Sequence, residues 1–183
     1  MLISTSRKPS QKTRKFCKTL ARVTDSTSVN RGKMNMRELL LKALEVDEYN
    51  LAIVNEIKGN PSRISFFSNK GELLLTILIG VTLDNEKTNF APSQLKIVSE
   101  VKQLDVLSDI LDLDLVYGAE DNYILISESE DSVARIYFIN KFGEKLNFQI
   151  NVKKVLEVSN DWWKSSGESQ KQHYCRIRKR CSG

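Results

Sequence analysis

The sequence of 183 residues is poor in the features that build disulfide frameworks and membrane anchors. Its three cysteines, Cys17, Cys175 and Cys181, have no paired spacing, so a reducing compartment is expected. The longest apolar run, residues 73–81, is far shorter than the roughly 20 residues of a membrane helix. The first residues lack the charged and apolar regions of a signal peptide. These absences predict a cytoplasmic protein that has no contact with a membrane.

The groups on which most enzymes depend are also scarce. The single histidine, His173, lies in a polar C-terminal stretch, and neither the P-loop pattern nor the dinucleotide-binding glycine pattern occurs. Cys17 falls on the apolar face of a predicted helix, where a core position is the simpler interpretation. Asp105, Asp109 and Asp112 could suggest a metal site, but their spacing places them on the solvent face of an amphipathic helix. We therefore expect no catalysis, no metal site, no cofactor and no small-molecule substrate.

What the sequence does contain is an uneven distribution of charge. Residues 1–42 hold eleven Lys and Arg against two acids, residues 43–163 hold eleven against twenty, and residues 164–183 hold six against one. The net charge of +5 therefore hides two basic ends on an acidic body. This asymmetry indicates a polyanionic partner, most simply nucleic acid. The 40% of hydrophobic residues indicates that the chain folds around a core.

The chain opens with a predicted strand and a predicted turn. Residues 2–5 are expected to form the short strand, and residues 6–10 the turn that leads into a helix. Pro9 suits the first helical position, because its missing N–H would be unpaired there in any case. Lys8 precedes the proline and is expected to be extended.

A helix is predicted from residue 10 to about residue 23. Apolar side chains repeat at three- and four-residue spacing and predict a core-facing side, formed by Phe16, Leu20 and Val23 with Cys17 and Thr13 beside them. Basic side chains form a stripe on the other faces, made of Lys8, Lys12, Lys15, Lys18 and Arg22. The stripe could be an ordinary solvated surface. Because no acid occurs before Asp25 to pair with it, and the first helical turn has free N–H groups, we favour a phosphate-binding surface.

Residues 31–33, Arg-Gly-Lys, predict a tight basic loop after a possible strand at residues 27–30. Gly32 allows a positive φ or a close approach of the backbone to a ligand, with a cation on either side. The loop could equally be an ordinary connection to the next helix, residues 36–45, for which Asn35 is the predicted N-cap. The apolar face of that helix is predicted at Leu39, Leu40, Ala43 and Leu44.

The rest of the chain predicts mainly strands. A turn is expected at residues 59–62, a connector at 84–94 and a helix at 101–113. Strands and hairpins are expected at residues 49–57, 63–83, 95–99, 123–126 and 135–158.

Residues 63–72 and 135–144 are visibly alike. Both begin with Arg-Ile, continue through aromatic residues, and turn at Asn-Lys with a Gly-Glu. We interpret this as an internal repeat of about 75–80 residues, too long for a solenoid, with half-repeats at about residues 1–83 and 95–158. Two unrelated hairpins with the same turn chemistry would also explain the likeness. Residues 159–183 predict a basic, flexible tail that becomes ordered on nucleic acid.

Two segments of the basic N-terminal region resemble the opening of the Brix domain, which is found in ribosome-biogenesis factors. They are Thr5-Ser6-Arg7-Lys8-Pro9-Ser10 and, about twenty residues later, Asn30-Arg31-Gly32-Lys33. The resemblance covers residues 1–158, includes the turn Gly59-Asn60-Pro61, and is strongest to the short archaeal members of the family.

The resemblance implies an α/β fold with a mixed sheet, made of two similar halves and related to the anticodon-binding domains of class IIa aminoacyl-tRNA synthetases. It also implies non-catalytic binding of ribosomal RNA or its precursor during subunit assembly. With the basic stripe and the backbone N–H groups near Ser10 and Gly32 added, the expected RNA-binding residues are Ser6, Arg7, Lys8, Ser10, Lys12, Lys15, Asn30, Arg31, Gly32 and Lys33. The second half departs from the first, since little room is left between Ile126 and Arg135 for a second helix like residues 36–45.

An alternative function is a protein-interaction scaffold in ribosome assembly, whose acidic second half recruits a basic ribosomal or assembly protein. An RNA-modifying enzyme is the third class, but the convergent catalytic groups that it requires are not visible in the sequence. Trp162 and Trp163 could close the core or contact a partner, and the sequence leaves both open.

Overall fold

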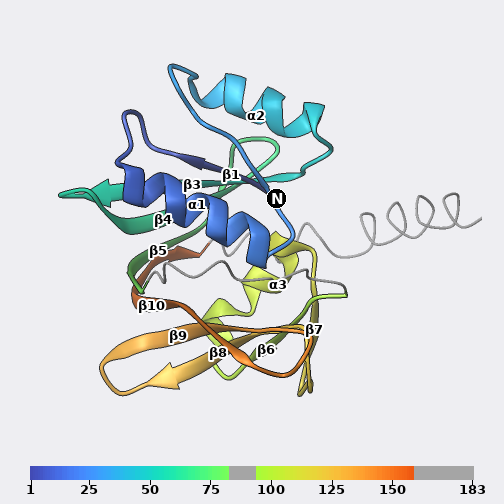
Figure 1. Ribbon diagram of the computed structural model, residues 1–183. Coiled ribbons are helices and arrows are strands. Elements are labelled where there is room, and N and C mark those ends of the chain that lie inside the picture. The colour runs from blue at the N-terminus through green and yellow to red at the C-terminus, as the bar shows by residue number, and fades with distance from the viewer. Residues whose placement is uncertain (83–93, 159–183) are drawn as a thin grey trace, which may run out of the picture.

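The structure is a computed structural model that describes residues 1–82 and 94–158, drawn in colour in Figure 1. Most of the predicted connector at 84–94 lies outside the described residues. So does the predicted tail at 159–183, with Trp162, Trp163 and His173. No helix of the described residues is long and apolar enough to cross a membrane.

The N-terminal half contains two helices and five strands. In chain order they are β1 (Leu2–Thr5), α1 (Gln11–Val23), β2 (Thr27–Ser28), α2 (Met36–Glu45), β3 (Asn50–Ile57), β4 (Asn60–Ser68) and β5 (Leu73–Thr82). β1 lies between β2 and β3 and is parallel to both, whereas β3, β4 and β5 form an antiparallel meander.

The C-terminal half repeats this order with shorter helices. Its elements are β6 (Lys96–Ser99), the 3₁₀ helix η1 (Lys102–Leu104), α3 (Val106–Leu111), β7 (Asp114–Val116), β8 (Tyr123–Ser129), β9 (Ser132–Ile139) and β10 (Lys145–Val158). β6 is parallel to β7 and β8, and β8, β9 and β10 are antiparallel.

All ten strands belong to one sheet with the order β2-β1-β3-β4-β5-β10-β9-β8-β6-β7. The two halves are joined where β5 pairs antiparallel with β10, so the sheet order reads the same outward from this seam in both directions. The predicted α/β fold with a mixed sheet and two similar halves is therefore confirmed. Its predicted relation to synthetase anticodon-binding domains stays a prediction.

The main core lies between α1 and the inner face of the curled sheet, and it draws on both halves (Figure 1). Phe16 of α1 contacts Phe148 of β10, with ring centroids 5.9 Å apart, and Phe148 stacks on Phe138 of β9 at 5.1 Å. Phe16, Leu20 and Val23 are buried as predicted. The aromatic contact between Phe16 and Phe148 therefore joins the two halves in one continuous core.

A second, smaller core lies under α2 on the opposite face of the sheet. Leu39 and Ala43 of α2 pack with Leu2, Leu51 and Ile53, which alternate along β1 and β3 with residues of the main core. The predicted N-cap at Asn35 is confirmed, and its side chain forms a capping box with Glu38. The apolar face predicted for α2 is buried only in part. Leu44 is 49% exposed.

The turn before α1 differs from the prediction. Ser10, not Pro9, lies at the helix boundary as the N-cap, and Lys8 has a φ of +54°, in the left-handed region rather than extended. The chain has to reverse direction between the end of β1 and the start of α1. A left-handed residue makes that reversal within a few residues.

Three further predictions need correction. The turn at 59–62 is confined to Lys58 and Gly59, which both have positive φ, because a two-residue hairpin follows the twist of β3 and β4. The helix predicted at 101–113 is divided at Asp105 into η1 and α3. It ends before residue 113, because Asp112 has a φ of +55°. β7 was not predicted. The place that corresponds to α2 is residues 117–122, between β7 and β8, and not the segment from Ile126 to Arg135.

Candidate nucleic-acid interface

Two basic loops leave the sheet side by side at one edge. One follows β1 and contains Arg7 and Lys8, and the other follows β2 and contains Arg31 and Lys33. Because β1 and β2 are parallel neighbours, their carboxyl ends lie at the same edge of the sheet. The helices that follow pack on opposite faces, α1 in the main core and α2 in the small core. In open α/β sheets this arrangement creates a crevice at the carboxyl ends, where ligands bind.

Backbone hydrogen bonds fix the start of each loop. The Ser6 N–H donates to the carbonyl of Val54 at 2.8 Å, which extends the β1–β3 pairing by one residue. The Val29 N–H donates to the carbonyl of Ile3 at 2.9 Å, and the Ser4 hydroxyl donates to the carbonyl of Val29 at 3.1 Å. Both loops therefore begin from a rigid base, and this limits how far the basic side chains can move apart.

Arg31 is the most constrained cation of the site. Its Nε donates to the carbonyl of Met34 at 3.1 Å, while the Met34 N–H donates to the carbonyl of Arg31 at 3.0 Å. Burial lowers the pKa of Arg31, and the positive charge of Arg7 lowers it further. The two guanidinium groups are thus close enough to repel. An anion placed between them would relieve that repulsion.

The four loop cations have no acidic partner in the described part of the chain. The ion pairs found there join Met1 to Glu48, Lys42 to Glu45 and Arg135 to Asp131, and none of these includes a cation of the two loops. Arg7, Lys8 and Lys33 are exposed, and Arg31 is half-buried. Asn30 is also exposed beside them. This edge of the sheet therefore carries side chains that can donate to a polyanion.

Gly32 sits at the tip of the second loop. It has a φ of +56°, a conformation that side chains rarely adopt, and no heavy atom lies within 4 Å of the position that a Cβ would take. The loop backbone is therefore open to solvent at this point, which agrees with a close approach of a ligand to the backbone.

Comparison with known proteins identifies the chain. A "probable Brix domain-containing ribosomal biogenesis protein" of Methanothermobacter thermautotrophicus is 34% identical over 153 residues, which cover 84% of this chain and 96% of that protein. The chain belongs to the Brix domain family. This result bears out the resemblance seen in the two loop motifs, although no family model matches the chain.

Other Brix proteins match a shorter part of the chain. A relative of the same description from Methanosarcina mazei is 49% identical over 78 residues, which cover 42% of this chain and 47% of the relative. The match therefore spans about half the length of that relative. The crystal structure of Mil, an archaeal Imp4-like protein, is similar with a TM-score of 0.75 and 27% identity, over 85% of this chain and 98% of that chain.

A second solved structure shares the Brix fold. It is that of a "probable ribosomal biogenesis protein" from Aeropyrum pernix, with a TM-score of 0.73, 21% identity, and coverage of 86% of this chain and 97% of that chain. At this identity the likeness concerns the fold alone.

In this Brix protein the start of α1 is not the open phosphate site that the sequence suggested. The Ser10 N–H donates to the carboxylate of Glu56 at 2.9 Å, and the Ser10 hydroxyl lies 2.8 Å from the same oxygen. The Ser10 hydroxyl also accepts from the Thr13 N–H at 3.1 Å. The Ser10 N–H is therefore not free. A carboxylate from β3 already takes the place of an anion at the helix N-terminus.

Glu56 is well suited to this place at the end of β3. Hydrogen bonds from Thr13, from the Ser10 N–H and from the Ser10 hydroxyl, with the nearby charge of Arg14, lower the pKa of Glu56 despite its partial burial. Sequence reasoning missed Glu56, because its partner Ser10 lies 46 positions away in the chain. No local pattern signals such a contact.

The basic stripe of α1 is exposed along the helix, as predicted for Lys12, Lys15, Lys18 and Arg22. The Lys12 ammonium donates to the side-chain oxygen of Asn60 at 2.6 Å, so this residue also ties α1 to the β3–β4 turn. The structure thus brings Ser6, Arg7, Lys8, Asn30, Arg31, Gly32 and Lys33 together at one edge and sets Ser10 behind them as the helix cap. RNA binding by these residues remains a prediction.

Cys17 occupies a core position in this Brix protein. The Cys17 thiol is buried against the carbonyl of Ser4, and burial raises its pKa to about 12, which leaves it protonated and unreactive. Within residues 1–82 and 94–158, no three His, Cys, Asp or Glu side chains are grouped so that they could hold a metal ion.

Proposed function

We propose that this Brix protein binds ribosomal RNA or its precursor during subunit assembly and that it does so without catalysis. The observation that carries the proposal is the meeting of two basic loops at one edge of the sheet. Arg7 follows β1 and Arg31 follows its parallel neighbour β2, and neither has an acidic partner among the described residues. Ribosome assembly in the cytoplasm is the setting that we infer from the family.

The binding mode follows from the type of side chain at the edge. Arg7 and Arg31 can each form two parallel hydrogen bonds to a phosphate, while Lys8 and Lys33 act as point charges beside them. Backbone N–H groups near Gly32 would add neutral donors. Such contacts position RNA by its shape and phosphates rather than by its base sequence. The affinity is therefore expected to fall steeply with salt.

The test is a double substitution, Arg7→Ala with Arg31→Ala, measured by RNA affinity at several salt concentrations. Loss of two phosphate contacts is expected to lower the slope of log affinity against log salt by about 1.4 for a single strand. The control is Lys70→Ala with Lys102→Ala, which removes the same charge from two exposed positions elsewhere. An unchanged affinity and slope in the first variant, with the fold intact, would show that the site is misplaced.

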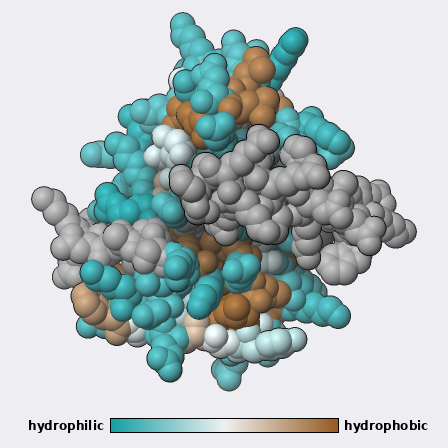
Figure 2. Space-filling model, turned by 90° about the vertical axis from the view of Figure 1, so that its right-hand side faces the viewer, coloured by the Kyte–Doolittle hydropathy of each residue, from teal (hydrophilic) through white to brown (hydrophobic). Residues whose placement is uncertain are grey.

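A second candidate function is recruitment of a protein partner, and exposed apolar side chains favour it. Leu41 and Leu44 of α2 are 52% and 49% exposed, and Figure 2 shows hydrophobic side chains gathered at the top of the molecule, at the level of α2. Acids also gather at and after α3, at Asp109, Asp112 and Asp114. A pull-down that recovers the same protein before and after nuclease treatment would support this function, and loss of all partners after nuclease would contradict it.

A further inference from the structure

The outer face of the C-terminal half is a sheet surface that no described helix covers. In the N-terminal half α2 packs on this face, whereas the corresponding place between β7 and β8 holds only residues 117–122. Register identifies the side chains that share the bare face. Arg135 lies opposite Asn151, and Tyr137 opposite Gln149, while their sequence neighbours Ile136 and Ile150 are buried in the core.

The two long strands that contribute to this bare face are rich in cations, although the half as a whole is acidic. β9 and β10 together contain four cations, Arg135, Lys145, Lys153 and Lys154, and a single acid, Glu157. Most of the acids of this half lie instead on α3, on β7 and in the loops. The net negative charge of residues 43–163 therefore combines two surfaces of opposite charge. The acidic one lies near α3, and the basic one lies on the two long strands beside the seam.

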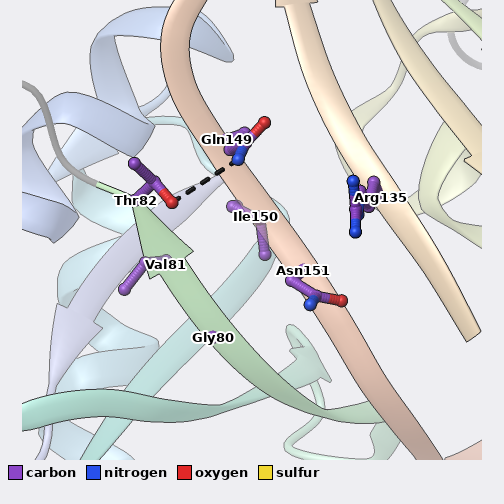
Figure 3. Close-up of a pocket in the computed structure, with 7 residues that line it drawn as sticks. All are labelled: Gly80, Val81, Thr82, Arg135, Gln149, Ile150 and Asn151. Atoms are coloured by element: carbon purple, nitrogen blue, oxygen red, sulfur yellow. Dashed lines mark hydrogen bonds between the residues drawn. The ribbon is translucent and has the colours of Figure 1, made fainter. Parts of the chain in front are cut away.

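A pocket of about 300 Å³ lies at the seam on this face (Figure 3). Its walls come from the end of β5, at Gly80 to Thr82, from Gln149 to Asn151 of β10, and from Arg135 of β9. The Gln149 side chain donates to the Thr82 hydroxyl at 3.5 Å across one end of the pocket. Pockets for small ligands measure roughly 300–1,000 Å³. The volume of this pocket is at the lower end of that range, so it suits a ligand no larger than one nucleotide.

Gly80 in the wall of the pocket leaves room for the side chain of Lys153. A Cβ at this position would lie 3.2 Å from the Cε and 3.7 Å from the Nζ of Lys153. The Lys153 ammonium therefore lies over Gly80, next to the pocket. Any side chain in place of Gly80 would occupy this space and displace the end of the Lys153 side chain.

Asn151 offers an unused acceptor at the same place. Its Oδ1 atom is buried and has no hydrogen-bond partner among the described residues, and Figure 3 shows its carboxamide turned toward β9 and Arg135. A buried acceptor without a donor is costly, by about 1–3 kcal/mol. A ligand with an N–H or O–H group in the pocket would remove this cost.

Cations also surround Tyr137, the aromatic side chain next to the pocket. The Lys145 Nζ lies 3.1 Å from the centroid of the Tyr137 ring. Burial raises the pKa of Tyr137, but hydrogen bonds and charges from Arg135 and Lys145 outweigh this and lower it. Among the described residues, Arg135 forms an ion pair with Asp131 at 3.5 Å. Both side chains are exposed, so this pair neutralises little of the local positive charge.

We propose that this pocket is a second RNA-binding site, which holds one nucleotide of a single-stranded segment. The proposal rests on the proposed function for the identity of the ligand. Arg135 and Lys153 bind the phosphate, and Asn151 accepts a hydrogen bond from a base amino group or a ribose hydroxyl. A single strand fits better than a duplex, because unstacked nucleotides can enter a pocket on an open sheet face.

The test uses a labelled single-stranded RNA and three variants of the full chain. Gly80→Val fills the pocket without changing charge, Arg135→Ala with Lys153→Ala removes the phosphate contacts, and Arg7→Ala with Arg31→Ala removes the loop contacts. We expect both pocket variants to weaken binding about fivefold to tenfold. Gly80→Val is expected to fold, since valine favours strands and the contact that it meets is the flexible end of Lys153. Thermal unfolding checks this.

The outcomes separate this proposal from the proposed function. If the loop variant loses affinity and both pocket variants keep it, the pocket proposal is wrong and the proposed function stands. If only the pocket variants lose affinity, the loops are not the main site. Equal competition by a duplex RNA or by polyglutamate would overturn the single-strand nucleotide site, because a simple cationic patch would explain that result. No binding of RNA by the unaltered chain would overturn both.

Discussion

The two halves share a strand order but differ in what covers their outer faces. Leu2 of β1 lies opposite Leu51 of β3, and both are buried under α2. Lys96 of β6 lies opposite Tyr123 of β8 in the corresponding place, where Lys96 is exposed and Tyr123 half-buried. One architecture thus supports a closed face in one half and an open face in the other. The difference shows that the same strand order is compatible with apolar strand residues under a helix and with more exposed strand residues on an open face.

The largest effect on stability is expected from a comparison of two equivalent strand positions, one under α2 and one on the open face of the C-terminal half. Ile53 and Leu125 each stand third in the parallel pairing of their strand, but Ile53 is buried and Leu125 half-buried. Ile53→Ala is expected to cost about 3 kcal/mol of unfolding free energy and Leu125→Ala about 1 kcal/mol. Urea denaturation of both variants measures the difference, and equal losses would mean that α2 contributes little to the burial of its half.

The second largest effect on stability is expected at the helix N-termini, where the start of α1 is compared with the start of α3. Glu56→Gln is expected to destabilise the fold by about 1 kcal/mol, because it removes the charged partner of Ser10 at the start of α1. Asp105→Asn at the start of α3 is expected to change stability less, since Asp105 makes no capping hydrogen bond there. Thermal unfolding of the two variants at neutral pH checks the order. A larger loss for Asp105→Asn would contradict it.

The pH dependence of the Glu56 contact has a definite sign. Its pKa is lowered in the folded state, so its contribution to stability is present above the unfolded-state pKa of about 4.3 and is lost as the pH falls through the folded-state pKa. The stability difference between the unaltered chain and Glu56→Gln is therefore expected to shrink as the solution is acidified below about pH 4. A difference that stays constant down to the lowest pH would rule out this role of the carboxylate.

A smaller effect compares two buried polar atoms without a partner, one taken from each half. Thr5 Oγ1 in the first half and Asn151 Oδ1 in the second have no hydrogen-bond partner among the described residues. Thr5→Val and Asn151→Leu are expected to stabilise the fold by about 0.5–1 kcal/mol each, because each removes an unsatisfied buried group. Chemical denaturation measures the gain. A loss of stability in either variant would mean that an ordered water satisfies that atom.

The sequence allowed the core and most strands to be predicted because their signals are local. The spacing of Phe16, Leu20 and Val23 placed α1, and Asn35 placed the start of α2. Local signals failed where a distant contact decides the conformation. Lys8 is left-handed in a turn that leads to Ser10, and Ser10 is bound to Glu56 of β3, a strand far along the chain. This conformation could not be inferred from the proline alone.

For the candidate site too, residues in local motifs could be predicted, whereas residues placed by the tertiary fold could not. Arg7 and Arg31 lie in motifs that resemble a known family, and parallel pairing of β1 and β2 brings them together. Glu56 was missed because only the tertiary fold places it against Ser10. The basic face of β9 and β10 was missed because alternate residues of a strand face opposite ways, so a count over the whole segment cannot separate its two faces.

The seam between β5 and β10 has a consequence for the order in which the protein is made. β5 is complete by residue 82, but its pairing partner is the last described strand and ends at Val158. A chain that emerges from its N-terminus first therefore carries an unpaired strand edge, and a Phe16 without its neighbour Phe148, until β10 has been made. Open edges of this kind are the places where nascent chains associate wrongly.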